Sequence, residues 1–241
     1  MKKYFLLCAC FTIMLTSCNQ PLTSDQLLDK TIAFHDPNGN WNTFNGTFSV
    51  RMETPSRPTR DSKVTINLPD DSFNLAATRD SVTTQYFINK GKCVISATDS
   101  LRIANQTEKP RRSHCEMTEF FKNYYTYLYG LPMKLKDPGT HISDTIEHKS
   151  FKGKHYLVLK ASYDEGVGSD IWYFYFDPET YAMEIYQFFR TDENGNQKDD
   201  TGEYILLTEE EIINGIKMPK IRAWYTNKED TLLGTDILKT E

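Results

Sequence analysis

Apolar and polar residues follow two different periods along the chain. Apolar residues recur at helical spacing over residues 25–35, behind Ser24 in an N-cap position, until the turn-forming residues 36–40 end the pattern. A second helical pattern covers residues 116–129, where aromatic side chains occupy most of the surface. The sequence therefore predicts two helices, and the aromatic one must be covered on more than one side or lie against a ligand.

Most of the remaining chain alternates between apolar and polar residues with the period of two that is typical of β-strands. Turn sequences separate the segments, among them Asn89-Lys90-Gly91 and Lys152-Gly153-Lys154, and both suit antiparallel hairpins. The predicted strands are residues 46–53, 63–68, 72–78, 83–89, 92–98, 142–151, 155–163, 169–176, 181–190, 202–208, 216–226 and 231–238. Residues 99–113 are polar and predict a loop.

These elements predict an α+β fold. A single long, curved antiparallel sheet of about 11–12 strands must twist and curl to bury one face, which gives a half-barrel with the two helices on its concave side. An unrelated antiparallel barrel, such as a lipocalin-like one, is the alternative that the pattern leaves open. The length of 241 residues suits one β-rich domain over residues 24–241.

The N-terminal residues have the pattern of a bacterial lipoprotein signal peptide. Lys2 and Lys3 precede an apolar run that is too short to span a bilayer, and the run ends in Leu15-Thr16-Ser17-Cys18, which resembles a lipobox. The resemblance implies a signal peptide over residues 1–17, diacylation of Cys18 and a lipidated tether over residues 18–23. An ordinary secretory signal with a chance cysteine is the alternative.

Charge and cysteine content fit a protein of the cell envelope. The formal net charge of −5 becomes more negative when Lys2 and Lys3 are removed, which argues against a nucleic-acid partner. Asn19 stands where some bacteria place an aspartate to retain lipoproteins at the inner membrane, so we expect the outer membrane, with the leaflet undecided. In an oxidising compartment Cys93 and Cys115 either form a disulfide or remain two separate buried thiols.

Two motifs in the last third of the chain resemble the lipoprotein carrier and receptor family of LolA and LolB. Residues 172–185, WYFYFDPETYAMEI, resemble that family's strand, Asp-Pro-x-Thr turn and strand, and residues 215–221, GIKMPKI, resemble its C-terminal pattern. A resemblance over residues 24–240 implies a concave sheet face that is lined by apolar side chains, is covered by helices and accepts acyl chains. The period of two nominates as its lining Leu157, Leu159, Trp172, Phe174, Met183, Ile185, Ile221 and Tyr225. A filled core made of the same residues is the alternative.

No sequence pattern predicts a cofactor or a catalytic centre. The chain has no phosphate-binding loop, no dinucleotide-binding motif and no nucleophile elbow. The close spacing that directs two imidazoles at one zinc ion is absent from the histidines, which are His35, His114, His141, His148 and His155.

Residues 192–203 match part of a calcium-loop template. The oxygen-bearing side chains at its ligand positions are Asp192, Asn194, Asn196, Asp200 and Glu203. Gln197 stands where the template needs glycine for a sharp turn, and strands flank the loop in place of helices. A hairpin tip rich in Asp, Asn and Gly has the same composition for turn reasons alone, so no metal is assigned.

The sequence thus predicts a membrane-anchored lipoprotein that binds a lipid or another apolar ligand in a hydrophobic half-barrel without catalysis. A protein-interaction module of an envelope complex, which uses an exposed sheet edge or an aromatic patch, is the second hypothesis. An envelope hydrolase is the third, and it would need clustered acids or histidines in the cavity.

Overall fold

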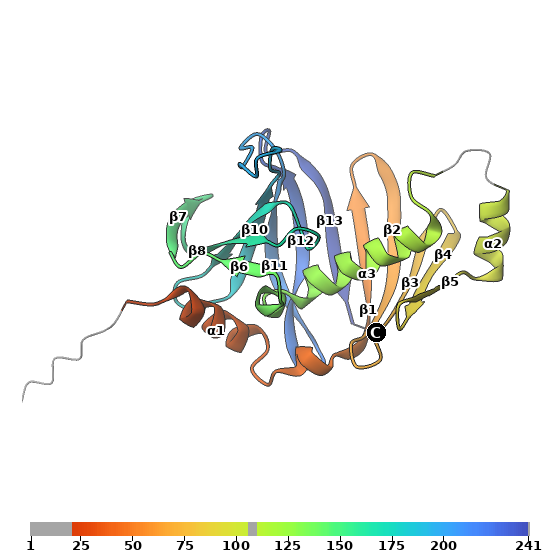
Figure 1. Ribbon diagram of the computed structural model, residues 1–241, viewed down its shortest axis with the longest axis horizontal. Helices are drawn as coiled ribbons and strands as arrows, with labels where there is room; N and C mark the ends of the chain where they lie inside the picture. The colour runs from red at the N-terminus through yellow and green to blue at the C-terminus, as the bar shows by residue number, and fades with distance from the viewer. Residues whose placement is uncertain (1–20, 106–109, 241) are drawn as a thin grey trace, which may run out of the picture.

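A computed structural model describes residues 21–105 and 110–240. In this part of the chain, 13 strands form one antiparallel sheet in the order β5-β4-β3-β2-β1-β13-β12-β11-β10-β9-β8-β6, and β7 pairs with β8. The sheet is strongly curved and does not close (Figure 1). The predicted α+β fold with a single curved sheet is confirmed.

The strands are mostly hairpin neighbours. Their bounds are β1 Asn45–Thr54, β2 Arg57–Asn67, β3 Ser72–Arg79, β4 Val82–Asn89, β5 Lys92–Val94, β6 Thr140–Ile142, β7 Glu147–Phe151, β8 Lys154–Tyr163, β9 Ile171–Phe176, β10 Met183–Phe189, β11 Glu203–Ile213, β12 Ile216–Thr226 and β13 Leu232–Lys239. The helices are α1 Ser24–His35, α2 Ala97–Ala104 and α3 His114–Gly130, with short 3₁₀ turns at Asn40–Thr43 and Met133–Lys136. None of these described helices is long and apolar enough to cross a bilayer.

Turn chemistry explains most of this topology. Lys90 and Gly91 both have positive φ angles, of 48° and 72°, and Lys152 and Gly153 have φ angles of 46° and 85°. Two successive residues with positive φ are what a two-residue turn needs to match the twist of its strands, and Gly adopts that conformation without steric cost. The β4–β5 and β7–β8 hairpins therefore form at the turns that the sequence predicts.

The main core lies between the sheet and helices α1 and α3. Helix α3 crosses the concave side of the sheet (Figure 1), and its Tyr129 ring stacks on Phe48 of β1 with the ring centroids 4.8 Å apart. Leu27 and Leu28 of α1 belong to the same buried cluster. The helix ends at Gly130, where a Cβ atom would lie 2.2 Å from the indole of Trp41. The close approach of Trp41 thus requires glycine at the end of α3.

A smaller cluster covers part of the outer face of the sheet. It contains Tyr156, Val158, Tyr173, Tyr175 and Ile185. The β7–β8 hairpin packs against these residues, since the Phe151 ring lies 5.6 Å from that of Tyr175. Lys152 at the tip of this hairpin donates to Asp230, 3.0 Å away, which fixes the hairpin over the outer face.

Several local predictions need correction. The N-cap of α1 is Thr23 and not Ser24, because the Thr23 hydroxyl accepts from the Gln26 amide. The predicted strand 92–98 ends at Val94, and the predicted loop 99–113 contains most of α2, whose N-cap is Ser96. The predicted strand 142–151 divides into β6 and β7. The predicted strand 202–208 continues to Ile213.

The two cysteines that the sequence left undecided form a disulfide. Cys93 of β5 and Cys115 of α3 have their Cα atoms 5.6 Å apart, within the usual range for this bond. Disulfides of this kind are typical of oxidising, extracytoplasmic compartments. The bond fixes the first turn of α3 to the edge of the sheet.

His35 fixes the other helix. Its ring is 3 % exposed, Nε2 accepts from the Met183 amide at 3.0 Å, and Nδ1 therefore carries the proton and donates to the Lys217 carbonyl at 2.8 Å. The ring thus joins the end of α1 to β10 and β12 in its neutral form. Burial lowers the pKa of His35 to about 4, with smaller contributions from the charges of Lys217 and Arg222.

We predict that the free energy of unfolding decreases as the pH falls from about 6.5 to 4, because the unfolded chain takes up a proton on His35 before the folded chain does. The shift corresponds to about 3 kcal/mol, fully present above the ordinary histidine pKa and lost below the folded one. Urea unfolding at a series of pH values measures the effect.

The variant His35→Leu should remove the dependence in this window and lower the stability at neutral pH. His155→Gln is the matched control, because His155 is exposed. An unchanged pH dependence in His35→Leu would show that His35 does not cause the loss of stability between pH 6.5 and 4.

Candidate functional site

The sheet face beneath α3 is filled with side chains. Tyr125 and Tyr129 of α3 are 1 % and 2 % exposed and pack on Phe73 and Phe48. Leu128 completes this buried side of the helix. The alternative of a filled core therefore holds for the centre of the concave face, and open space occurs at its margin.

A groove of about 560 Å³ lies along the flank of α3. Its far wall is formed by the segment 163–172 and by residues 137–140 at the end of the 3₁₀ turn. Its apolar and aromatic lining consists of Phe120, Tyr124, Tyr127, Tyr163, Val167 and Trp172. This volume is in the range of pockets that hold small molecules, and such pockets are mostly apolar and aromatic.

The floor of the groove is a network of aromatic rings. The Tyr127 ring meets Trp172 edge-on with 5.6 Å between centroids, and Trp172 stacks on Phe188 at 5.0 Å. The hydroxyls of Tyr127 and Tyr163 share a hydrogen bond. Burial raises the pKa of Tyr163 to about 12 and that of Tyr127 well above its ordinary value, so both hydroxyls stay neutral.

The rim of the groove is polar. Lys134 donates to Asp137 at one end, and Asp170 lies among the lining residues. Partial burial raises the pKa of Asp170, against the opposing charge of Arg190. An apolar floor with a charged rim suits a ligand that has an apolar body and a polar end.

A buried polar cluster lies directly behind this groove. Arg222 is 1 % exposed, its guanidinium stacks 3.9 Å above the Tyr129 ring, and its Nη1 donates to the Pro219 carbonyl at 2.8 Å. Asp236 stands opposite Arg222 in the β12–β13 register. Burial raises the pKa of Asp236, against the charge of Arg222.

Tyr124 connects the cluster with the groove. Its ring lines the groove, and its hydroxyl donates to Asp236 Oδ2 at 3.5 Å. Trp224 Nε1 donates to the same oxygen at 3.1 Å. Among the described residues Arg222 Nε and Asp236 Oδ1 have no partner, which is the situation that an ordered water or a polar ligand group resolves.

The structure brings only part of the predicted lining together. Leu159, Phe174 and Met183 are buried in the main core, and Leu157 and Trp172 pack against it. Of these five, Trp172 alone lines the groove. The other four fill the core, as the alternative in the sequence analysis expected.

The remaining three predicted lining residues lie elsewhere. Ile185 belongs to the outer cluster, because a register irregularity between Met183 and Ile185 changes which face the alternation presents. Ile221 precedes the inward-facing Arg222, so it points to the outer face. Tyr225 stacks on Tyr204, with the centroids 5.0 Å apart, away from the groove.

Tyr124, Tyr127, Arg222 and Asp236 were not singled out by sequence reasoning. The aromatic density of residues 116–129 was the signal for the two tyrosines, since it indicated a helix that is covered on more than one side or lies against a ligand. Arg222 and Asp236 gave no such signal, because a charged residue in a strand is normally exposed.

The calcium-loop candidate forms a hairpin tip. Asp192 Oδ1 accepts from the amides of Asn194 and Asn196, at 2.9 Å and 2.8 Å, and Oδ2 accepts from the Asn196 side chain. Asp200 lies 4.0 Å from Lys228, and partial burial raises the pKa of Glu203. The Asp192 carboxylate thus organises the turn, which is the alternative that the sequence left open.

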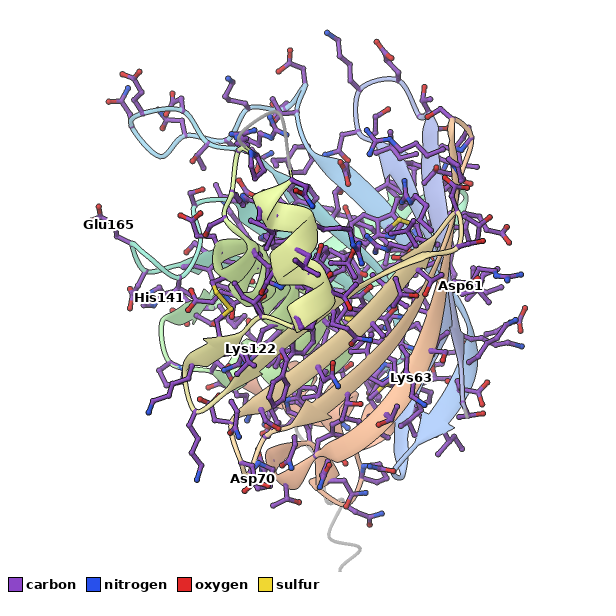
Figure 2. The ribbon with its side chains drawn as sticks, turned by 90° about the vertical axis from the view of Figure 1, so that its right-hand side faces the viewer. Asp61, Lys63, Asp70, Lys122, His141 and Glu165 are labelled. Atoms are coloured by element: carbon purple, nitrogen blue, oxygen red, sulfur yellow. A yellow bond between two sulfur atoms is a disulfide. The ribbon has the colours of Figure 1, made fainter. Side chains whose placement is uncertain are left out.

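The histidines and acids of the described residues do not assemble into a metal site. No group of three His, Cys, Asp or Glu side chains in residues 21–105 and 110–240 is placed to hold an ion. His141 is paired with Asp164 at 2.6 Å, and Figure 2 shows it at the left edge of the molecule. Ser150 and His155 share a hydrogen bond on the β7–β8 hairpin.

We predict that Arg222→Met lowers the free energy of unfolding by about 3 kcal/mol, because it removes the stronger of the two cationic charges, Arg222 and Arg60, that stabilise the buried Asp236 carboxylate. Adding Asp236→Asn should recover part of the loss, since the second side chain is then neutral. Urea unfolding of the two single variants and the double variant measures the coupling.

Arg51→Met is the matched control, because Arg51 pairs with Asp61 on the surface. Its cost should stay below about 1 kcal/mol. Equal costs at Arg51 and Arg222 would contradict the energetic role of the buried cluster.

Comparison with solved structures finds two similar chains. The crystal structure of a LolA superfamily protein from Nitrosomonas europaea is similar, with a TM-score of 0.54, 9% sequence identity and coverage of 91% of this chain and 93% of that chain. The crystal structure of a DUF1329 family protein from Desulfovibrio piger has a TM-score of 0.47 at 8% identity, with coverage of 90% and 91%.

The first of these similarities shows that the fold is LolA-like. No curated protein sequence matches the chain. A family model matches residues 2–240, and the chain therefore belongs to DUF6503, a family of unknown function.

Proposed function

We propose that this protein is a membrane-anchored envelope lipoprotein that binds the acyl chain of a lipid, or another apolar ligand, in the groove beside α3. The observation that carries the proposal is the aromatic groove of about 560 Å³ on the helix-covered side of a LolA-like sheet. LolA-like folds generally bind lipids or other apolar ligands. The proposal assigns the chain no chemical step.

The energetics favour an amphiphile. Each methylene group that leaves water for an apolar floor stabilises a complex by about 0.8 kcal/mol. The groove offers such a floor in Tyr127 and Trp172, whereas Lys134, Asp137 and Asp170 at the rim face the solvent side. A ligand with an acyl body and a polar end matches both parts.

Anchoring of the domain is the second part of the proposal. Cys18 lies outside the described residues, and α1 begins at Ser24 with its N-cap at Thr23. Diacylation of Cys18 would therefore hold the domain on a short tether close to the membrane surface. We place this membrane at the outer membrane, and the periplasmic and surface leaflets are both compatible with the chain. A fixed domain fits a receptor or sensor better than a shuttle.

We expect an acyl ligand to co-purify with the chain. The experiment expresses the full-length Cys18→Ser chain in the bacterial envelope, isolates it without detergent and analyses the organic extract by mass spectrometry. An amphiphile at a near-stoichiometric amount is the expected result, because the apolar groove favours occupancy. A clean extract, also after incubation with envelope lipids, would contradict the proposal.

A charge in the groove should reduce this binding. Val167→Glu places a carboxylate in the apolar lining at a side chain that is 59% exposed, so folding should be preserved. Val82→Glu is the matched control, because Val82 is 51% exposed and lies on β4. The bound amount should fall severalfold in the first variant alone.

The anchor gives an independent prediction. The N-terminal peptide of the wild-type protein should carry the mass of a diacylglyceryl group on Cys18, and the protein should sediment with membranes. Cys18→Ser should abolish both properties. Cys8→Ser and Cys10→Ser are the controls, because these residues lie in the predicted signal peptide and should have no effect. An unmodified N-terminus in the wild type would show an ordinary secretory signal.

A further inference from the structure

Within residues 21–105 and 110–240, part of strand β4 has no strand on its outer side. Strand β5 pairs only with residues 87–89 of β4, so Val82–Tyr86 lies at an edge of the sheet. An edge of this kind presents backbone N–H and C=O groups that another chain can pair with. The exposed segment contains no charged residue and no proline that would prevent such pairing.

Side chains of α2 occupy this edge in place of a strand. Asp99 Oδ2 accepts from the Gln85 amide at 3.1 Å, and Arg102 donates to the Thr83 carbonyl. A second guanidinium nitrogen of Arg102 donates to Thr84 Oγ1 at 3.0 Å. One acidic and one basic side chain thus provide the acceptor and the donor that a neighbouring strand would provide.

Helix α2 is attached mainly through these polar contacts. It has 8 residues, and Asp99 is the buried one among them. Its apolar side chains are not buried, since Leu101 is 67% exposed and Ile103, which lines the groove beside the start of α3, is 38% exposed. A short helix without a buried apolar side is marginal on its own and opens at low free-energy cost. Figure 2 shows α2 as the helix nearest the viewer at this end of the sheet.

The disulfide allows α2 to leave the β4 edge and return to it. Cys93 precedes α2 and Cys115 follows it, with a sequence separation of 22 residues. The bond therefore holds both ends of the loop that contains α2, whatever position the helix adopts. Strand β5 and the start of α3 stay in place when α2 leaves the edge.

The surroundings of the edge select an acidic partner. A groove of about 860 Å³ lies between β4, α2 and the start of α3. Arg102, Arg111, Arg112 and His114 line it, against the acidic Asp99 and Glu116. Asp99 is paired with Arg102 at 3.2 Å, and Arg111 and Arg112 are exposed. Two copies of this chain that paired through β4 would bring these arginines together, which is unfavourable.

We propose that the outer edge of β4 is a docking site for an extended acidic segment of a partner protein, which displaces α2 and adds a strand beside Val82–Tyr86. This inference goes beyond lipid binding and does not depend on it. Backbone hydrogen bonds to Thr83 and Gln85 provide the affinity, and Arg111 and Arg112, which lie outside α2, provide the preference for acidic side chains.

The test uses the full-length Cys18→Ser chain and a short fluorescent peptide in which Val and Thr alternate with Glu. A second peptide carries N-methyl groups on alternate backbone nitrogens, and a third has Lys in place of Glu. Fluorescence anisotropy measures binding, and hydrogen exchange of the Thr83 and Gln85 amides locates it on the chain. Of the three peptides, only the unmethylated Glu peptide should bind, and it should slow the hydrogen exchange of the Thr83 and Gln85 amides.

The variant Asp99→Ala should tighten binding of the acidic peptide roughly tenfold, because it removes the acceptor that occupies the Gln85 amide. Asp61→Ala is the matched control, since it removes one negative charge from β2 and leaves the β4 edge unchanged. Asp61 is labelled at the right of Figure 2, the view in which α2 faces the viewer.

Three results would overturn the proposal. Equal binding of the N-methylated peptide would show that the backbone of β4 is not involved. Equal binding of the Lys peptide would show that the arginines around the groove do not select acidic side chains. Absence of binding by both the parent chain and Asp99→Ala would show that this edge accepts no such partner. Dimerisation of the variant in place of peptide binding would lead to the same conclusion.

Discussion

An antiparallel sheet that does not close has two faces and two edges, and the position of each described helix follows from the face or edge that it covers. In the part of the chain that the structure describes, α3 and α1 cover the concave face, and the β7–β8 hairpin covers part of the outer face. Helix α2 covers an edge by side-chain hydrogen bonds. These elements are attached by different kinds of contact, and this difference determines where the protein can bind other molecules. A cover with large apolar burial is permanent, whereas a cover with polar contacts is removable.

The concave face is covered by large apolar burial. Tyr129 and Tyr125 are almost fully buried between α3 and the sheet, where their rings pack on Phe48 and Phe73. The open volume lies along the flank of α3, where the helix presents Tyr127 and the far wall presents Trp172. Tyr124 faces both the groove and Asp236, so an occupant of the groove would contact a residue whose hydroxyl is part of the buried polar cluster. Tyr124 is therefore the side chain through which the groove and the buried polar cluster meet.

The sequence predicted the features that depend on local chemistry. Turn residues such as Lys90-Gly91 fixed the hairpins, and the alternation of apolar residues fixed a single curved sheet, because both signals act over a few residues. The side-chain faces were less predictable. The irregularity between Met183 and Ile185 shifts the alternation within β10. Strand β12 alternates without interruption, but it places the charged Arg222 on the same inward face as Met218 and Trp224. Neither follows from local sequence, since His35 of α1 accepts from the Met183 amide and Tyr129 of α3 stacks on Arg222.

Helix α2 shows a different limit of sequence reading. Its capping residues Ser96 and Asp99 are present in the chain, but Asp99 also contacts Gln85, and the polar composition of the segment is the composition of a loop. A helix whose role is to saturate a strand edge needs hydrogen-bonding side chains on its inner side and has no apolar stripe to reveal it. Helices α1 and α2 lie at opposite ends of the molecule (Figure 1). A membrane anchor at Cys18 would be close to α1, and the β4 edge would then be free to meet a partner away from the anchored end.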